Sequence, residues 1–155
     1  MSSLIEITDC RVDLESLKVV KSRSQETLCY SATVVFDGKA IACLDNDGRG
    51  GSTCFYPKDG CETDIAEMKA YMSSHGLTIE FSFDELAECL SEVAAIKRKM
   101  KKNILIEKAD SIMAYSLEPT SKNYEIVKMK NPTSVILNKL SEMELRELIH
   151  KTMLK

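Results

Sequence analysis

Apolar and polar residues alternate with a strand period near the start of the chain and with a helical period over much of the remainder. Thr27 to Phe36 is rich in β-branched and aromatic residues, which favour a strand, and a second apolar run, Lys39 to Leu44, follows Asp37-Gly38. An Asp-Gly pair between two such runs is typical of a type I′ turn, because that turn needs φ > 0 at both central positions. The pattern therefore predicts an antiparallel β-hairpin over 27–44.

Shorter apolar runs and helical spacing predict the other elements. Strands are expected at Leu4–Ile7, Thr53–Tyr56, Leu77–Phe81, Ser111–Leu117 and Tyr124–Met129. Helices are expected over Glu62–Ser74 with Gly76 at its end, over Ser82–Lys102 behind the capping box Ser82–Glu85, and after a second capping box, Ser141–Glu144. Together these elements predict an α+β fold, in which an N-terminal antiparallel hairpin or sheet packs against helices in a single domain over 1–155.

Length and charge narrow the classes of function. A chain of 155 residues can bury a sizeable core without disulfides or metal. Its net charge of −3 argues against broad nucleic-acid binding, which needs clustered positive charge. The one basic run, Lys97–Lys102, is interpreted as a solvated helix end that complements the helix dipole.

The chain has no feature of a membrane or secreted protein. No stretch approaches the ~20 apolar residues of a membrane span, and the first residues lack the basic start and apolar run of a signal peptide. We therefore expect a cytoplasmic protein. Its six cysteines are accordingly expected to be reduced thiols: Cys10, Cys29, Cys43, Cys54, Cys61 and Cys89.

One segment after the hairpin concentrates residues that could bind a ligand. Three of the six glycines lie within Asp45–Ser52. Glycines let a ligand approach the backbone closely, and consecutive amides in such a turn can form a nest for an anion. Arg49 could add a bidentate contact to a phosphate, and Asp45 and Asp47 could bind ribose hydroxyls, a metal or a partner's arginine. The candidate ligand-binding residues are Asp45, Asn46, Asp47, Gly48, Arg49, Gly50, Gly51, Ser52 and Thr53.

Known motifs do not fit this segment or the rest of the chain. The glycine spacing is neither that of a P-loop nor that of a dinucleotide-binding turn. An EF-hand fails because Arg49 falls at its fifth position and Tyr56 where its glutamate belongs. No C-x-x-C pair suggests zinc, and neither His75 nor His150 is flanked by a nucleophile elbow. No catalytic residue, metal ligand or cofactor is assigned, and a non-enzymatic role is favoured.

The hairpin turn and the glycine-rich loop together resemble a pattern found in other small proteins. With Phe36-Asp37-Gly38-Lys39 followed by Asn46-Asp47-Gly48-Arg49-Gly50-Gly51, the chain resembles a loosely defined group of small phage and prophage proteins of unassigned function, which carry a hairpin, an N-D-G-x-G-G loop and then helices. The resemblance implies a phage-type accessory protein in a bacterial cytoplasm. By analogy with such proteins it implies a counter-defence role, and it implies no catalytic residues.

These observations lead to one functional hypothesis and one alternative. The leading hypothesis is a non-enzymatic binding protein that sequesters an anionic nucleotide-like ligand, or inhibits a host protein, through Asp45–Thr53. The alternative is a Mg²⁺-dependent enzyme acting on nucleotides or nucleic acid, with Asp45, Asp47 and a remote glutamate holding the ion. The apolar stripe of the Ser82–Lys102 helix also suits self-association into a homodimer.

Overall fold

The structure is a computed structural model that describes residues 3–7 and 11–153. The chain falls into two compact units, Met1–Ser91 (unit 1) and Glu92–Lys155 (unit 2), and the boundary lies inside the long helix α2 (Ile79–Met100). Each unit is described by itself, and the expectation of a single domain over 1–155 stays a prediction. Cys10 lies outside the described residues.

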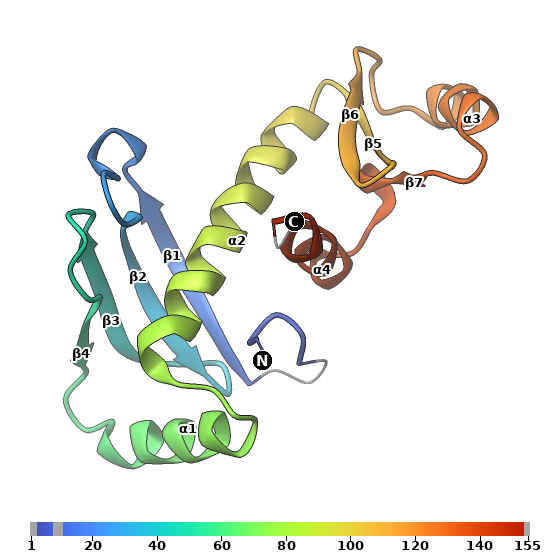
Figure 1. The fold of residues 1–155 in the computed structure, drawn as a ribbon. Coiled ribbons are helices and arrows are strands. Elements are labelled where there is room, and N and C mark those ends of the chain that lie inside the picture. Colours follow the sequence, from blue (N-terminus) through green and yellow to red (C-terminus); the bar gives the residue numbers. More distant parts are fainter. Residues whose placement is uncertain (1–2, 8–10, 154–155) are drawn as a thin grey trace. The chain divides into compact units, whose positions relative to one another are not determined.

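Unit 1 is built on a four-stranded antiparallel sheet in the order β1-β2-β3-β4 (Figure 1). Its strands are β1 (Val12–Val19), β2 (Cys29–Phe36), β3 (Lys39–Asp47) and β4 (Cys54–Pro57), with a short 3₁₀ helix, η1 (Lys21–Arg23), between β1 and β2. The predicted hairpin is confirmed as β2 and β3. Its turn has φ of 51° at Asp37 and 79° at Gly38, as a type I′ turn requires.

Helices follow the sheet in unit 1. Helix α1 (Glu62–Ser74) has the predicted bounds, and Gly76 follows it with φ of 72°. The first part of α2 crosses one face of the sheet (Figure 1). Phe83 of α2 stacks on Phe55 of β4 with ring centroids 6.2 Å apart. Alternate side chains of β2 and β3 on one face are buried, among them Tyr30, Ala32, Val34, Ala42 and Leu44. The N-terminal antiparallel sheet packed against helices, and with it the α+β class, is thereby confirmed.

Two predicted strands and one predicted capping box of unit 1 are wrong. Leu4–Ile7 forms a turn and not a strand, although Leu4 and Ile5 are buried. Leu77–Phe81 is not a strand either, because α2 already begins at Ile79. Ser82 therefore lies inside the helix, where its amide donates to the Thr78 carbonyl and no capping box forms. Periodicity alone cannot separate a short buried strand from one turn of a helix.

Unit 2 contains a three-stranded antiparallel sheet in the order β6-β5-β7, with β5 (Ile104–Lys108), β6 (Ser111–Tyr115) and β7 (Val135–Ile136). Two helices, α3 (Ser121–Lys130) and α4 (Glu142–Met153), and a 3₁₀ turn, η2 (Leu137–Lys139), complete it (Figure 1). One cluster of buried residues joins the sheet to α3: Ile104, Ile106, Val127 and Ile136.

Predictions in unit 2 succeed where local signals are specific. The second capping box is confirmed, since the Glu144 amide donates to Ser141 Oγ at 3.2 Å and the Ser141 amide to Glu144 Oε1 at 3.0 Å. Tyr124–Met129 is a helix and not a strand. It belongs to α3, whose N-cap Thr120 accepts from the Asn123 amide. The long helix, expected to end at Lys102, ends at Met100 and is followed by β5.

The apolar stripe of α2 is used inside the protein. Leu86 and Val93 are each 2% exposed, so these two side chains are not available to a second copy of the chain. A homodimer stays a prediction without an assigned surface. In the part of the chain that the structure describes, no helix combines the length and the apolar character needed to cross a bilayer.

Candidate functional site

The predicted ligand-binding segment is divided between a strand and a loop. Asp45, Asn46 and Asp47 were expected in the loop, but they belong to β3 and pair with Ser31, Tyr30 and Cys29 of β2. Cross-strand pairing overrides the turn preference of these residue types. Only residues 48–53 form the loop to β4. Because side chains alternate along a strand, Asp45 and Asp47 lie on one face of the sheet and Asn46 on the other.

Asn46 holds the loop in shape. Its side chain is 4% exposed. Its Oδ1 accepts from Thr27 Oγ1 at 2.9 Å and from the Gly48 amide at 2.8 Å. Its Nδ2 donates to the Gly51 carbonyl at 3.2 Å and to Thr53 Oγ1 at 3.0 Å. Both donors and both acceptor positions of this amide group are thus occupied within the protein, which makes Asn46 a residue that builds the site.

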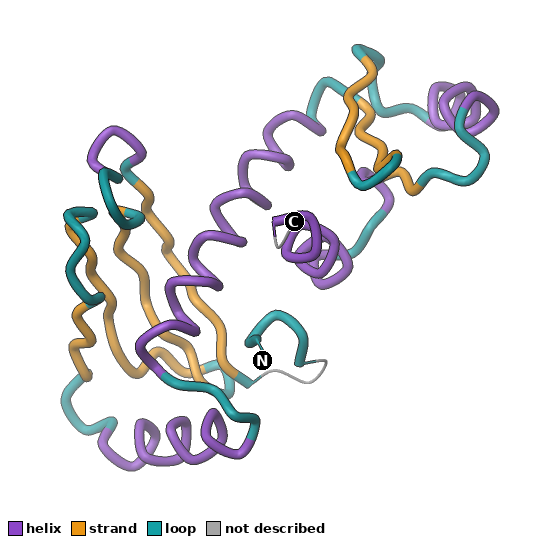
Figure 2. Tube along the Cα trace, viewed as in Figure 1, coloured by secondary structure: helices purple, strands orange, loops and turns teal. Residues whose placement is uncertain are grey.

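The glycines of the loop allow it to lie against the 23–27 segment. Gly48 has φ of 79°, and a Cβ there would lie 2.2 Å from the Arg23 carbonyl oxygen. The Gly48 carbonyl accepts from the amides of Gln25, Glu26 and Thr27 at 3.0 to 3.4 Å. The loop and the 23–27 segment therefore lie side by side (Figure 2). No residue with a Cβ fits at position 48 without a shift of the backbone.

Three amides of the loop donate to side chains of β3 and of the 23–27 segment. The Gly48 amide donates to Asn46 Oδ1, the Arg49 amide to Asp47 Oδ1 at 3.0 Å, and the Gly50 amide to Thr27 Oγ1 at 3.3 Å. An anion nest needs amides that point at the ligand. An anion at this loop would accordingly have to be bound by side chains, and Arg49 is exposed for such a contact.

A hydrogen-bonded chain links the loop to α2. Thr53 Oγ1 accepts from Asn46 and donates to Asp84 Oδ1, which also accepts from the Tyr30 hydroxyl at 2.6 Å. Tyr30 is 2% exposed. Burial, together with the hydrogen bond to Asp84, raises the pKa of Tyr30 above its usual value. The chain Thr27–Asn46–Thr53–Asp84–Tyr30 therefore fixes this end of the sheet on α2.

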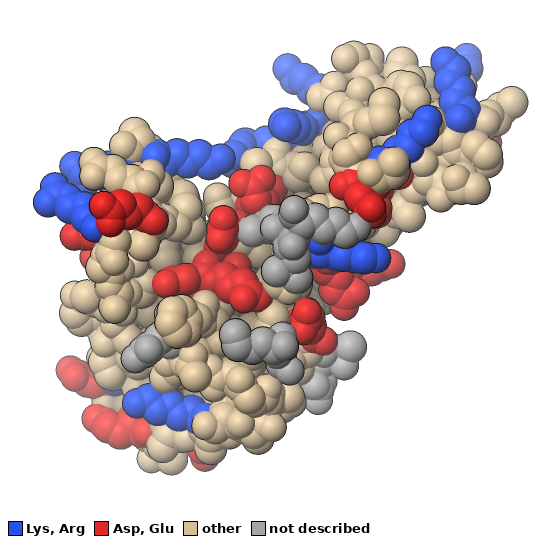
Figure 3. Space-filling model, in the orientation of Figure 1, with Lys and Arg blue, Asp and Glu red and all other residues tan. Residues whose placement is uncertain are grey.

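Two hollows open beside this chain. The first, of about 440 Å³, is lined by Arg23, Gln25, Cys29, Asp45, Asn46, Asp47 and Arg49. The second, of about 340 Å³, lies next to α2 and is lined by Ser24, Gln25, Glu26, Thr27, Leu28, Asn46, Asp84 and Glu88. Positive and negative side chains lie together at this end of the sheet (Figure 3). The first hollow combines two arginines with two aspartates, and the second has only carboxylates as its charged groups.

The structure brings together part of the predicted site. Asp45, Asn46, Asp47 and Arg49 line the first hollow, whereas Gly48, Gly50 and Thr53 bond to neighbouring segments. Gly51 contributes its carbonyl to Asn46, and Ser52 is exposed. Four further residues of the site were not predicted: Arg23, Thr27, Tyr30 and Asp84. Arg23 belongs to η1, Thr27 was expected only as the start of a hairpin strand, and no local pattern distinguishes Tyr30 or Asp84.

Neither histidine is among the residues that line the two hollows. His75 lies at the end of α1, where its Nδ1 is 3.0 Å from the Tyr71 carbonyl oxygen, and His150 is buried in α4. Within residues 3–7 and 11–153, no group of three or more His, Cys, Asp or Glu side chains could hold a metal ion. The glutamate expected to join Asp45 and Asp47 around magnesium is not among the residues that line their hollow.

The described cysteines are free thiols. Cys61 and Cys89 are buried and Cys29 is half-buried. Cys43 is exposed, because it lies on the sheet face opposite α2, as does Cys54.

Comparison with known proteins adds no relative. No family model, no curated protein and no solved structure matches this chain. The fold and the site therefore define an α+β protein with a polar, mixed-charge hollow at one end of its first sheet.

Proposed function

We propose that the protein is a non-enzymatic binding protein that holds an anionic, nucleotide-like ligand in the first hollow, at Asp45–Thr53 together with Arg23. The observation that carries the proposal is the pair of arginines, Arg23 and Arg49, around a hollow of about 440 Å³ whose other charged groups are Asp45 and Asp47. A guanidinium group binds a phosphate in bidentate fashion, and a carboxylate accepts from ribose hydroxyls. A nucleotide offers both kinds of partner in one molecule.

Preorganisation supports the same proposal. Arg49 follows Gly48, whose position is set by the Asn46 side chain and by the three amides that bond to its carbonyl. A loop held in this way loses little conformational entropy when a ligand binds, so more of the interaction energy appears as affinity.

The biological setting of the proposal comes from the resemblance to small phage proteins. With it we propose a cytoplasmic location in a bacterial host and a counter-defence role, in which the protein removes a nucleotide signal from solution. A host protein that meets the same surface is the competing occupant.

The test is a thermal-shift panel of nucleotides and cyclic dinucleotides, with and without Mg²⁺. A ligand at a hundred times its Kd stabilises the folded protein by about 2.7 kcal/mol. We expect a shift with a nucleotide that disappears in Arg49→Ala and in Arg23→Ala. It should persist in the matched control Arg98→Ala, which removes an exposed arginine of unit 2.

Two further results decide between classes of function. Recovery of the nucleotide intact after incubation is expected of a binding protein, whereas its Mg²⁺-dependent breakdown would establish the enzymatic alternative. If no member of the panel shifts the melting temperature, the nucleotide proposal is wrong. Capture of a host protein by the wild type but not by Arg49→Glu would then identify the other occupant.

A further inference from the structure

Charge is divided unevenly between the two units. Unit 2 carries thirteen Lys and Arg against eight Asp and Glu, a net charge of +5, whereas unit 1 carries eight against sixteen, a net charge of −8. The net charge of −3, which argued against nucleic-acid binding, is thus the sum of two opposite values. A unit of about sixty residues with this excess of lysine has the charge that a polyanion requires of its partner.

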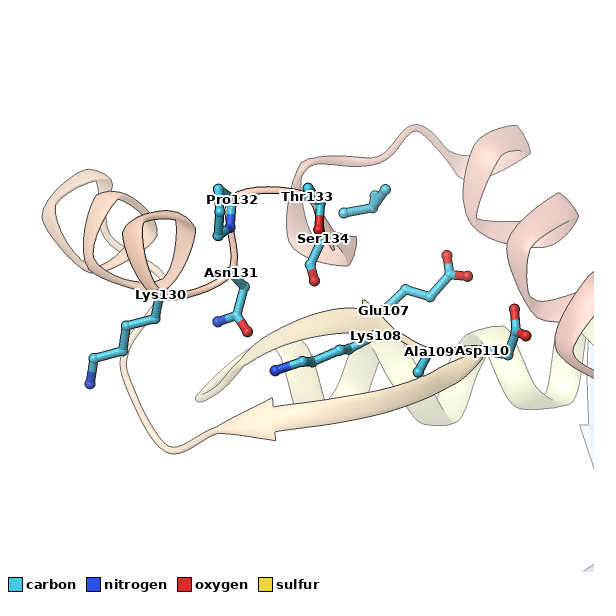
Figure 4. A pocket seen from close by; sticks show the side chains of 10 residues that line it. Glu107, Lys108, Ala109, Asp110, Lys130, Asn131, Pro132, Thr133 and Ser134 are labelled. Atoms are coloured by element: carbon cyan, nitrogen blue, oxygen red, sulfur yellow. The ribbon is translucent and has the colours of Figure 1, made fainter.

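The largest hollow described in unit 2 is bordered by part of this positive charge. It has a volume of about 460 Å³ and lies between the β5–β6 turn and the segment that follows α3. In Figure 4, Asn131, Thr133 and Ser134 project from that segment toward the hairpin, and Lys108 extends below Asn131. The carboxylates of Glu107 and Asp110 lie at the other end of the hollow in this view. One end therefore presents an ammonium group together with hydroxyl groups.

The wall that carries these groups is fixed by hydrogen bonds. Asn131 is 5% exposed, and its Nδ2 donates to the Tyr115 hydroxyl and to the Val127 carbonyl, each at 3.0 Å. The Ser134 amide donates to the Asn131 carbonyl at 3.1 Å. The positions of the polar groups are consequently set before any ligand binds.

A second hollow adjoins the first and adds two lysines. It has a volume of about 330 Å³ and shares Thr133, Ser134 and Val135 with the first. Lys128 Nζ donates to the Ser134 carbonyl at 2.9 Å, and Lys139 Nζ lies 5.0 Å from the centre of the Tyr124 ring. Four exposed lysines thus border the segment 133–135, two in each hollow: Lys108 and Lys130 in the first, Lys128 and Lys139 in the second.

We propose that this lysine-bordered segment binds the phosphate backbone of nucleic acid. Lysine ammonium groups with Ser and Thr hydroxyls are usual partners of backbone phosphates, and Asn131 holds the wall that carries them. Two adjoining hollows with two lysines each suit consecutive phosphates of one strand, whereas a single small anion would occupy only one of them. A flat lipid surface does not enter a recess. The contact is sequence-independent, because it reaches phosphates and not base edges.

The test is fluorescence polarisation of labelled 20-nucleotide single-stranded DNA, duplex DNA and RNA with the full chain, between 50 and 200 mM salt. We expect binding to at least one of them that weakens as salt increases. Each phosphate contact contributes about 0.9 to the slope of log K against log salt for duplex DNA and about 0.7 for single strands. Lys108→Gln with Lys130→Gln should therefore lower the slope by about 1.8 on duplex or about 1.4 on single strands, and weaken binding at least tenfold at 100 mM salt.

The matched control is Lys122→Gln with Lys151→Gln. It removes the same charge from two exposed lysines of unit 2 that line neither hollow, and binding should stay within about twofold of the wild type with the slope unchanged. The two proposals can fail separately, because the proposed nucleotide site lies in unit 1 and the lysine-bordered segment in unit 2.

Three results would overturn the proposal. The first is no binding to any of the three nucleic acids at 50 mM salt. The second is equal weakening by the hollow pair and the control pair, which would indicate a response to net charge alone. The third is binding to phosphatidylserine vesicles or to polyglutamate without binding to nucleic acid, which would assign the surface to a lipid or an acidic protein.

Discussion

The two hairpins of this protein have the same turn and different sequences. The β2–β3 turn has φ of 51° at Asp37 and 79° at Gly38, and the β5–β6 turn has φ of 50° at Ala109 and 64° at Asp110. Left-handed backbone costs a residue with a Cβ roughly 1–2 kcal/mol, while glycine adopts it freely. The first turn is therefore specified by its own residues, whereas the second is imposed by the strands that it joins.

The two units also differ in how many hydrogen bonds their buried asparagine makes. In unit 1, the buried Asn46 has four hydrogen bonds to its own protein. In unit 2, the equally buried Asn131 donates two, while hydroxyls and lysines nearby face a hollow. The buried amide of unit 1 therefore has twice as many hydrogen bonds to its own protein as the buried amide of unit 2. Substitutions at matched positions can test this difference.

The largest expected effect is at Asn46. Asn46→Ala removes four hydrogen bonds at about 1 kcal/mol each and leaves buried partners unsatisfied, so we expect unit 1 to lose about 4 kcal/mol of unfolding free energy. Asn131→Ala removes two such bonds and should cost unit 2 about 2 kcal/mol. Urea unfolding, followed by hydrogen exchange of amides in each sheet, measures the two losses separately. Equal losses would show that the two asparagines have the same role.

The next effect is at the closest backbone approach of the loop. Gly48→Ala forces a Cβ to within 2.2 Å of the Arg23 carbonyl oxygen at φ of 79°, and we expect a loss of about 3 kcal/mol in unit 1. The matched control is Gly51→Ala, whose Cβ would meet nothing within 4 Å and whose effect should stay within about 0.5 kcal/mol. Urea midpoints measure both, and a tolerated Gly48→Ala would mean that the loop is not held against the 23–27 segment.

Predictions from the sequence were correct where the signal lies within a few neighbouring residues. Asp37-Gly38, Gly76 and the Ser141–Glu144 capping box each act within a few residues, and all three have the predicted geometry. The Ala109-Asp110 turn gives no such signal, because its conformation comes from the pairing of β5 with β6. Short apolar runs were misassigned, since helix and strand share their composition over so few residues.

The candidate site was likewise predictable only where its residues are close together in the sequence. Asn46, Gly48 and Arg49 could be selected from the density of turn residues, although that density did not reveal that Asn46 is structural. Arg23 and Asp84 lie 23 and 38 residues from Asn46 in the sequence. They reach the site only through the pairing of β2 with β3 and the packing of α2. A contact made by tertiary structure leaves no local pattern.

A smaller effect should distinguish Tyr30 of unit 1 from Tyr124 of unit 2. Tyr30→Phe removes a buried hydrogen bond to a carboxylate and should cost about 1.5 kcal/mol at pH 7. Tyr124→Phe keeps its ring under Lys139 and should change stability by less than about 0.5 kcal/mol. Chemical denaturation of both variants measures these values, and similar losses would contradict the difference.

The loss at Tyr30 should also depend on pH. Because the pKa of folded Tyr30 lies above its usual value, the wild type gains full stability from the neutral phenol below the unfolded pKa of about 10. That gain is lost as the pH rises from about 10 toward the folded pKa. The difference in unfolding free energy between wild type and Tyr30→Phe should therefore become smaller above pH 10. A difference that grows above pH 10 would show that folding does not raise the pKa of Tyr30.

The smallest expected effects come from substitutions in the two hairpin turns, one that makes the first turn less suited to left-handed backbone and one that makes the second turn better suited to it. Gly38→Ala places a Cβ on a left-handed residue in open space and should cost unit 1 about 1 kcal/mol from backbone conformation alone. Ala109→Asn places a residue that tolerates this region at φ of 50° and should stabilise unit 2 by about 0.5 kcal/mol. Opposite signs at the two turns, measured by urea midpoints, are expected if only the first turn suits its own residues. A loss on Ala109→Asn would instead mean that the alanine packs within the β5–β6 turn, and the cost assigned to its backbone would then be offset by contacts that asparagine cannot make.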